Sequence, residues 1–151
     1  MQALHILLVE DDEIDAEVLI RGFRRQGFEP LITIARNGLE ALTLLRDPLA
    51  QQHNGQPHVI LTDINMPVMN GLELLQAVRC DPNLHRSIVF VLSGSALDVD
   101  RRAAYALQAA GYLLKADLAQ NLPQLICLLE CYRSIVQFPP DLHLNTALPG
   151  V

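Results

Sequence analysis

The side chains best suited to chemistry are carboxylates that stand where two apolar runs end. Asp63 follows the run 59–62, and an acidic cluster at 10–12 follows the run 5–9. Such aliphatic runs predict strands buried on both faces of a parallel sheet. The carboxyl ends of these strands meet at the rim where open α/β sheets place their ligands. Clustered carboxylates repel one another unless protons or a cation relieve them, so the sequence predicts an acidic pocket for a divalent metal.

Two further polar residues follow apolar runs in the same way. Ser93 comes after the run 88–92, and Lys115 comes after 112–114. A serine or lysine that leaves a strand is usually only solvated, and an isolated aspartate before a turn is often a helix cap. However, a hydroxyl and an ammonium group beside a metal-bound carboxylate are what a phosphoryl group requires. Four such positions on four runs therefore favour a phosphoryl-binding site.

Short aliphatic runs alternate with longer amphipathic ones along the chain, which is the pattern of βα units. Strands are predicted at 4–9, 30–35, 58–62, 87–92 and 111–114. Helices are predicted at 14–26, 38–46, 71–79, 98–110 and 119–136, and 47–57 is predicted to be a surface loop. Five units with right-handed crossovers predict a doubly wound parallel sheet covered on both faces.

Composition limits the partners and the location of the protein. The 151 residues, of which 50% are hydrophobic, fit a single domain. No apolar run approaches the roughly 20 residues that span a bilayer, and no basic and apolar leader begins the chain. We therefore expect a cytoplasmic protein without membrane contact. The net charge of −6 argues against nucleic acid as the main partner.

Two helical patterns predict which side chains are buried. In the first predicted helix, one apolar stripe that should face the core consists of Ile14, Val18, Leu19 and Phe23. In the last predicted helix, Cys127 and Cys131 lie one turn apart. Packing against apolar neighbours is the expected role of these two cysteines, with metal binding or redox chemistry as the alternative.

Over roughly residues 3–136, the chain resembles the receiver domain of two-component response regulators. The resemblance rests on Glu10-Asp11, on Asp63 within Asp-Ile-Asn-Met-Pro, on Gly71, on Ser93 and on Lys115 after Gly-Tyr-Leu-Leu. It implies a flavodoxin-like fold with five strands in the order 2-1-3-4-5 and five helices. A receiver domain would occupy residues 1–137, and a C-terminal extension would occupy 138–151.

The resemblance also implies a role for each acidic residue. Asp63 would be the phosphoacceptor, and Asp11 would bind Mg²⁺ or Mn²⁺ directly. Glu10 would hold the ion mainly through water, and Asn65 would offer its backbone carbonyl.

The same resemblance gives the switch residues. Ser93 would be the hydroxyl that moves to the phosphoryl group, Lys115 would pair with that group, and Tyr112 would be the aromatic residue that turns inward on activation. Two positions depart from the family pattern: Ala116 stands where a proline is common, and Gly94 stands where alanine is frequent.

A finer resemblance is to the stand-alone regulators paired with bacterial and cyanobacterial phytochromes. It rests on the long segment 47–57, the connection 80–84 and the aromatic-proline tail that begins at Phe138. It implies a sensor histidine kinase as partner, and a homodimer through the fourth helix, fifth strand and fifth helix. The last helix has more apolar residues than one core stripe requires, so Leu129 and Tyr132 are expected to face outward, with a wide core-facing stripe as the alternative.

Two other functions compete with a phosphorylated signalling protein that is not itself an enzyme. Haloacid-dehalogenase-type phosphatases use an Asp-x-Asp-x-Thr pattern, but here the third and fifth positions are Asn65 and Pro67, so the general acid is missing. A degenerate receiver would bind partners without phosphorylation, although the acidic residues are complete. We expect no output domain in this chain, so signalling should pass through protein contacts.

Overall fold

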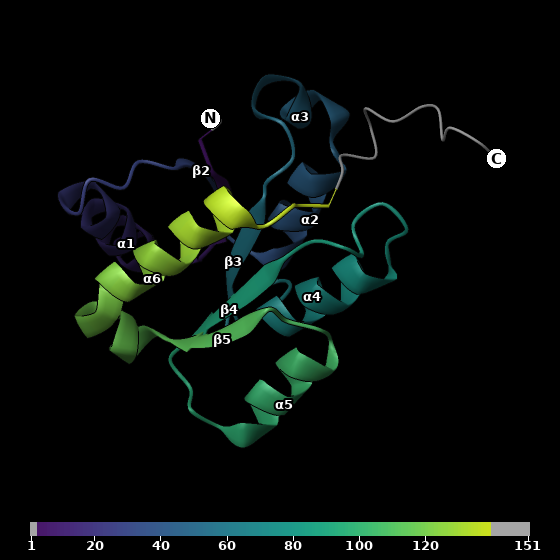
Figure 1. Ribbon diagram of the computed structural model, residues 1–151. Coiled ribbons are helices and arrows are strands. Elements are labelled where there is room, and N and C mark those ends of the chain that lie inside the picture. The colour runs from purple at the N-terminus through teal and green to yellow at the C-terminus, as the bar shows by residue number, and fades with distance from the viewer. Residues whose placement is uncertain (1–2, 140–151) are drawn as a thin grey trace.

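The computed structural model describes residues 3–139 and contains one five-stranded parallel sheet (Figure 1). The strands are β1 (His5–Val9), β2 (Leu31–Ala35), β3 (Val59–Asp63), β4 (Val89–Ser93) and β5 (Gly111–Leu114). Their order is β2-β1-β3-β4-β5, which confirms the predicted flavodoxin-like topology. Asp63 and Ser93 are the last residues of their strands rather than the first residues after them.

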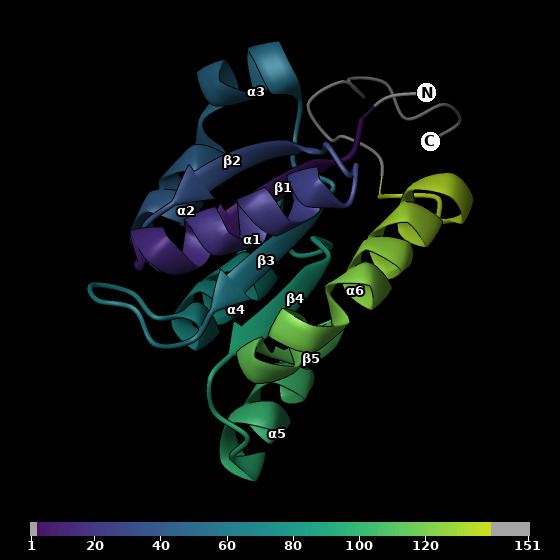
Figure 2. The same ribbon diagram turned by 90° about the vertical axis from the view of Figure 1, so that its left-hand side faces the viewer.

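Helices cover both faces of the sheet (Figure 2). They are α1 (Glu13–Arg25), α2 (Gly38–Arg46), α3 (Pro48–Asn54), α4 (Gly71–Cys80), α5 (Asp98–Ala106) and α6 (Lys115–Ile135). Apolar residues of α1 and α6 pack on one face, and those of α2, α4 and α5 pack on the other. The described residues thus form six helices, so the prediction of five was wrong by one.

The additional helix is α3, which lies within the segment 47–57 that was predicted to be a loop. Pro48 is its first residue, where the missing backbone N–H is not needed. The Leu49 N–H donates to the Asp47 carboxylate at 2.9 Å, which caps the start of the helix. Pro48 therefore begins this short helix, and Gly55 follows its last residue. The fourth and fifth predicted helices correspond to α5 and α6.

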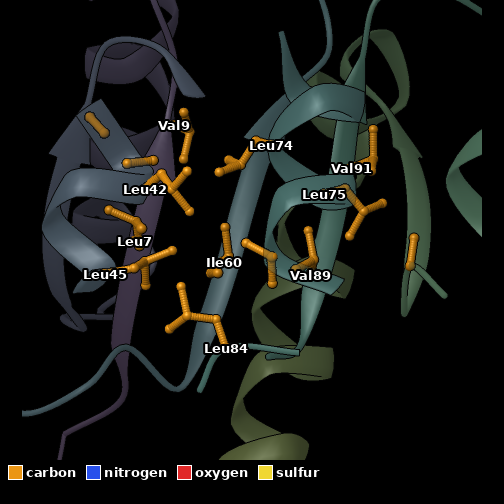
Figure 3. Packing of buried hydrophobic residues seen from close by; sticks show 14 of the residues in the cluster. Leu7, Val9, Leu42, Leu45, Ile60, Leu74, Leu75, Leu84, Val89 and Val91 are labelled. Atoms are coloured by element: carbon orange, nitrogen blue, oxygen red, sulfur yellow. The ribbon is translucent and has the colours of Figure 1, made fainter. Parts of the chain in front are cut away.

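The core on the α2 and α4 side is built mainly from leucine, isoleucine and valine, with alanine and one methionine among them. Figure 3 shows side chains of β1, β3 and β4 meeting those of α2 and α4. All residues of these three strands are buried, as expected for the centre of a parallel sheet. Burying one such side chain fully contributes about 1.5–3 kcal/mol, so this layer fixes the positions of the strand ends.

Helix α1 turns two of its predicted core residues to the solvent. Ile14 and Val18 are 72% and 65% exposed, whereas Ala16 and Phe23 are buried. The prediction for Ile14 and Val18 was wrong because the core-facing stripe is narrower than the run of apolar residues suggested.

Helix α6 differs from its prediction in its start and in its faces. It begins at Lys115 and has a non-helical backbone at Asn121, two residues before Pro123. Because a proline inside a helix removes one backbone hydrogen bond, the kink falls in this turn.

Two predictions about the part of α6 that follows Asn121 were also wrong. Leu129 is fully buried, so it belongs to the core and does not face outward. Cys127 and Cys131 are exposed, so the packing role predicted for them was wrong. Both thiols lie on the side of the helix turned away from the sheet.

The chain ends are described only in part. Of the predicted extension 138–151, only Phe138 and Pro139 belong to the described residues, and the Phe138 ring lies 5.0 Å from the His58 ring. Among residues 3–139, no helix has the length and apolar character needed to cross a bilayer.

Candidate functional site

Three carboxylates meet at the carboxyl end of the sheet. Glu10 follows β1 and Asp63 ends β3, and these neighbouring strands bring them together with Asp11. One carboxylate oxygen of each residue lies within 4.8 Å of the others. Glu10 and Asp63 are only 4% and 6% exposed, whereas Asp11 is exposed. The spacing fits a single divalent cation, since oxygen ligands on one ion must approach this closely.

Lys115 is the cation that the protein itself places among these groups. Its ammonium nitrogen lies 2.8 Å from Glu10 Oε2 and 3.1 Å from Asp63 Oδ2. The same nitrogen lies 3.1 Å from Asp15 Oδ2. Lys115 is the first residue of α6, directly after β5, so the strand end aims it at the pocket.

The electrostatics of the pocket show in two pKa shifts. Burial raises the pKa of Glu10 to about 7; the hydrogen bond from Lys115 opposes this rise and the charge of Asp63 adds to it. Burial alone would lower the pKa of Lys115, but its bonds with Glu10 and Asp63 outweigh this effect and raise that pKa. The pocket therefore disfavours the ionised form of Glu10 even though Lys115 donates to it.

Asp63 is fixed on both sides. Its Oδ1 accepts the Ile64 N–H at 2.8 Å, while Oδ2 accepts from Lys115. The Thr62 hydroxyl donates to the Asp63 carbonyl at 2.9 Å. A Cβ on Gly71 would stand 1.9 Å from that same carbonyl oxygen, so only glycine allows α4 to begin this close to the strand end. The carboxylate thus has a set position at the rim.

Asp12, the last residue of the predicted acidic cluster 10–12, holds the start of the helix after β1. Asp12 caps α1 by accepting the Ile14 N–H at 2.9 Å, and its own N–H donates to Glu10 Oε1 at 3.2 Å. Asp15, in the first turn of α1, was not predicted to belong to the site. An acidic residue in the first helical turn after the 10–12 cluster was the available signal for its contact with Lys115.

Ser93 and Tyr112 are linked through Ser95. Ser93 is fully buried, and its hydroxyl oxygen accepts the Ser95 N–H at 2.9 Å. The Tyr112 hydroxyl donates to the Ser95 carbonyl at 2.8 Å. The structure therefore joins the two predicted switch residues into one chain of contacts, and the intervening Ser95 was not predicted. A Cβ on Gly94 would meet nothing within 4 Å, so the approach beside Ser93 is open.

Two remaining predicted positions also lie at this rim. Asn65 is exposed, two residues beyond Asp63 in the β3–α4 loop. Ala116 is the second residue of α6. A proline there would disfavour a helical backbone at Lys115, so alanine allows α6 to start directly at the lysine.

The comparisons with known proteins agree with this geometry. The profile of the family described as "Response regulator receiver domain" matches residues 6–126. The chain therefore belongs to the receiver domain family of response regulators.

Within that family the chain is similar to regulators of phytochrome signalling. Response regulator Rcp1 of Synechocystis sp. is 30% identical over 127 residues, which cover 84% of this chain and 86% of Rcp1. The structure of the phosphorylated cyanobacterial phytochrome response regulator RcpA has a TM-score of 0.79 at 29% identity, covering 92% of this chain and 100% of RcpA. Mn²⁺-bound Rcp1 has a TM-score of 0.70 at 30% identity, covering 91% and 99% of the two chains.

Proposed function

We propose that this protein is a single-domain response regulator that accepts a phosphoryl group on Asp63 from a sensor histidine kinase of the phytochrome type. The observation that carries the proposal is the buried Asp63 carboxylate, which lies beside Glu10 and Asp11 and accepts a hydrogen bond from Lys115. The similarity to RcpA and Rcp1 supports the phytochrome pathway. The protein then acts as a signalling molecule rather than as an enzyme.

The residues present fit a divalent ion. Asp11 and Asp63 would bind Mg²⁺ or Mn²⁺ directly, Glu10 through water, and Asn65 through its carbonyl. When bound, the ion neutralises charge on phosphoryl oxygens. The similar regulator Rcp1 has been crystallised in an Mn²⁺-bound form, which supports binding of a divalent ion. An Asp63 oxygen forms the new O–P bond while the N–P bond of the kinase phosphohistidine breaks, and the histidine imidazole leaves.

Lys115 and Ser93 provide the response to the new group. Lys115 already donates to Asp63 Oδ2, so it is placed to pair with phosphoryl oxygens. Phosphorylation adds about −1.5 to −2 charge, which attracts the Ser93 hydroxyl. Movement of Ser93 would break its contact with the Ser95 N–H, and the Tyr112 hydroxyl would leave the Ser95 carbonyl as the ring turns inward.

Exposed residues of α1 offer a docking surface for the kinase. Ile14 and Val18 are one turn apart on the helix that begins beside the acidic pocket. Exposed apolar side chains next to a reactive site are typical of contact surfaces. Val18→Glu should therefore slow phosphotransfer from the kinase and leave uptake from acetyl phosphate unchanged.

A homodimer through α5, β5 and α6 is part of the proposal. A cavity of about 420 Å³ lies along this face and is lined by Leu113, Leu118 and Leu128, among others. Leu128 is half-exposed, so it replaces the buried Leu129 as the residue to test. Leu128→Glu should lower the particle mass measured by light scattering, whereas Gln124→Glu in the same cavity lining should keep the mass of the wild type. An unchanged mass in Leu128→Glu would place the interface elsewhere.

The decisive experiment is incubation with acetyl phosphate and Mg²⁺ followed by intact mass measurement. The wild type should gain one phosphoryl group, and Asp63→Asn should gain none while keeping its folded melting transition. Asp15→Asn is the matched control, because it also removes a contact with Lys115 but should still be phosphorylated. Uptake by Asp63→Asn would overturn the assignment. No uptake by the folded wild type would favour a degenerate receiver, and turnover of a phosphomonoester would favour a phosphatase.

A further inference from the structure

Strand β2 forms one edge of the sheet, and its outer edge is apolar. No other strand among residues 3–139 pairs with that edge. Leu31 and Ile34 are 39% and 43% exposed, whereas β1 and β3 are buried throughout. The strand sequence Leu-Ile-Thr-Ile-Ala has neither a charged residue nor a proline. Because natural proteins usually protect free edges with charge, proline or a bulge, β2 lacks the expected protection.

The backbone of β2 presents a regular set of free groups. The Leu31 N–H donates to the Leu4 carbonyl at 2.8 Å, and the Ala35 carbonyl accepts the Glu10 N–H at 2.9 Å. Residues 31 and 35 therefore point their backbone groups towards β1. Since consecutive residues of a strand point to opposite edges, Ile32 and Ile34 direct their N–H and C=O groups outward.

A furrow runs between α1 and this edge. Two adjoining cavities of about 460 and 620 Å³ share Ile20, Arg24 and Ile34 among their lining residues. Glu29 lines the cavity at the start of β2, and Arg36 lines the cavity at its end. The edge is therefore apolar in its middle, acidic before its first residue and basic after its last.

We propose that β2 is a contact between two copies of this chain, which pair as antiparallel edge strands about a two-fold axis at Thr33. In this register Ile32 of one copy lies opposite Ile34 of the partner subunit, and these two residues exchange both backbone hydrogen bonds. The two-fold axis repeats this pair on the other side of Thr33. The Arg36 N–H donates to the backbone carbonyl of Pro30 of the partner subunit. Pro30 has no N–H to donate, and it falls at the end of the ladder.

The side chains favour a second copy over any other strand. Ile32 faces the partner's Ile34 across the pair, and apolar cross-strand pairs of this kind stabilise sheets. Arg36, which lies 3.1 Å from Glu13 of its own chain, falls opposite the partner's Pro30 and next to the partner's Glu29. The acidic start of one strand thus comes near the basic end of the other. Antiparallel pairing produces this match twice, because the interface is isologous.

Neighbouring registers fit less well. An axis at Ile34 would set Ile32 against the partner's Arg36, so that a single Ile34–Ile34 pair replaces the two Ile32–Ile34 pairs. An axis at Ile32 would set Ile34 against the partner's Pro30, which removes two of the backbone hydrogen bonds, one at each end. The sequence of β2 thus selects the axis at Thr33.

This contact is separate from the α5–β5–α6 face, because β2 and β5 are the two opposite edges of the sheet. The inference goes beyond the proposed function, and its failure would leave that function unchanged.

A cysteine cross-link tests the register directly. In a variant with Cys80, Cys127 and Cys131 replaced by serine, Thr33→Cys should form a covalent dimer with glutathione disulfide. Two thiols become one disulfide, and one glutathione disulfide is reduced to two glutathione thiols. Directly opposed residues at a non-hydrogen-bonded position have Cα atoms about 4.5 Å apart, which a disulfide can span. Leu31→Cys is the matched control, because residue 31 faces the partner's Ala35. Absence of the dimer, or equal cross-linking of both variants, overturns the proposal.

A second variant covers the case in which loss of the Thr33–His5 hydrogen bond prevents folding. Ile34→Lys places a charge on the exposed edge, and the particle mass by light scattering should fall to half that of the wild type or lower. Val18→Lys, an exposed residue on α1, should leave the mass unchanged. An unchanged mass in Ile34→Lys overturns the proposal. If Leu128→Glu alone lowers the mass, the α5–β5–α6 dimer stands and the β2 contact does not.

Discussion

At the carboxyl end of the sheet three carboxylates share one lysine, whereas at the amino end one arginine is satisfied by four backbone carbonyls. The Arg79 guanidinium, near the end of α4, donates to the carbonyls of Leu107, His85, Ser87 and Gln108 at 2.8–2.9 Å. These carbonyls lie just before β4 and β5. The arginine therefore ties two strand entrances to α4.

The amino end is also closed by neutral groups. The His5 N–H donates to His58 Nδ1 at 2.9 Å, and the His5 ring lies 2.8 Å from the Thr33 hydroxyl. No carboxylate takes part in these bonds. By contrast, at the carboxyl end burial and the neighbouring charge of Asp63 raise the pKa of Glu10 to about 7, although Lys115 opposes this rise.

The two ends of the sheet therefore differ in whether their polar groups can bind a ligand. Groups that are already paired stabilise the fold but have no capacity left for a ligand. Groups that repel one another lower stability, and a cation or phosphoryl group that binds them recovers it. Variants at the amino end should thus change stability without changing the response to Mg²⁺, and variants at the carboxyl end should change that response.

The largest effect on stability is expected for Arg79→Ala. Removing the guanidinium leaves four carbonyls without their donor, and loss of charged hydrogen bonds of this kind should lower the free energy of unfolding by about 3 kcal/mol. Urea unfolding measures the change. Arg79→Lys is the control, since one ammonium replaces the charge but not the planar fork, and it should lose nearly as much. A changed Mg²⁺ response in Arg79→Ala would contradict the prediction that variants at the amino end affect stability alone.

The two ends should respond to pH in opposite directions. Glu10 has a folded-state pKa near 7 against an ordinary value of 4.5, so the folded state binds more protons between these values. Its contribution to stability therefore falls as pH rises from about 4.5 to 7, by roughly 2 to 3 kcal/mol in total. Burial lowers the pKa of His58 below 6.5, so its contribution rises as pH increases towards 6.5.

Urea unfolding in EDTA at several pH values separates these contributions. Glu10→Gln should remove the falling part of the profile, and His58→Gln should remove the rising part. Equal profiles for wild type and Glu10→Gln would show that Glu10 titrates normally in the fold. Adding Mg²⁺ should flatten the fall in the wild type, because the ion favours the ionised carboxylate.

Metal binding gives the next effect. At a Mg²⁺ concentration ten times the dissociation constant, binding to the native state alone stabilises it by roughly 1.4 kcal/mol. The melting temperature of the wild type should rise accordingly, and that of Asp11→Ala should not, because this variant lacks a direct ligand. Asp12→Ala is the control: it loses the cap of α1 and some stability, but should keep the Mg²⁺ response. A similar rise in Asp11→Ala would remove Asp11 from the ligand set.

The strand ends were predictable because buried parallel strands are continuous apolar runs and the first polar residue marks the rim. Asp63, Ser93 and Lys115 lie at strand ends for this reason. Helix faces were harder to predict. Ile14 and Val18 belong to an apolar pattern but are exposed to solvent. Leu129 is buried in the core, although the pattern of α6 did not determine which of its apolar residues face the sheet.

Contacts between loops could not be predicted, because they depend on how the chain closes in three dimensions. The bond between Tyr112 and the Ser95 carbonyl joins residues 17 apart, and the bonds of Arg79 reach two loops, one before β4 and one before β5. Neither follows from spacing along the sequence. The backbone conformation of Val68 could not be predicted either, because valine rarely adopts a positive φ.

Val68 gives the smallest expected effect and tests whether the carboxyl end also carries backbone strain. Its φ is 69°, it is 76% exposed, and the Met69 N–H donates to the Pro67 carbonyl at 2.7 Å across it. A β-branched residue in this conformation is strained. Val68→Gly removes the strain but loosens the unfolded chain, so the net gain in stability should be roughly 0.5 to 1 kcal/mol. Leu97→Gly, also exposed but with φ of −66°, should lose stability in the same urea measurement. If both variants are destabilised alike, the loop after Asp63 stores no strain, and charge alone separates the reactive end of the sheet from the structural end.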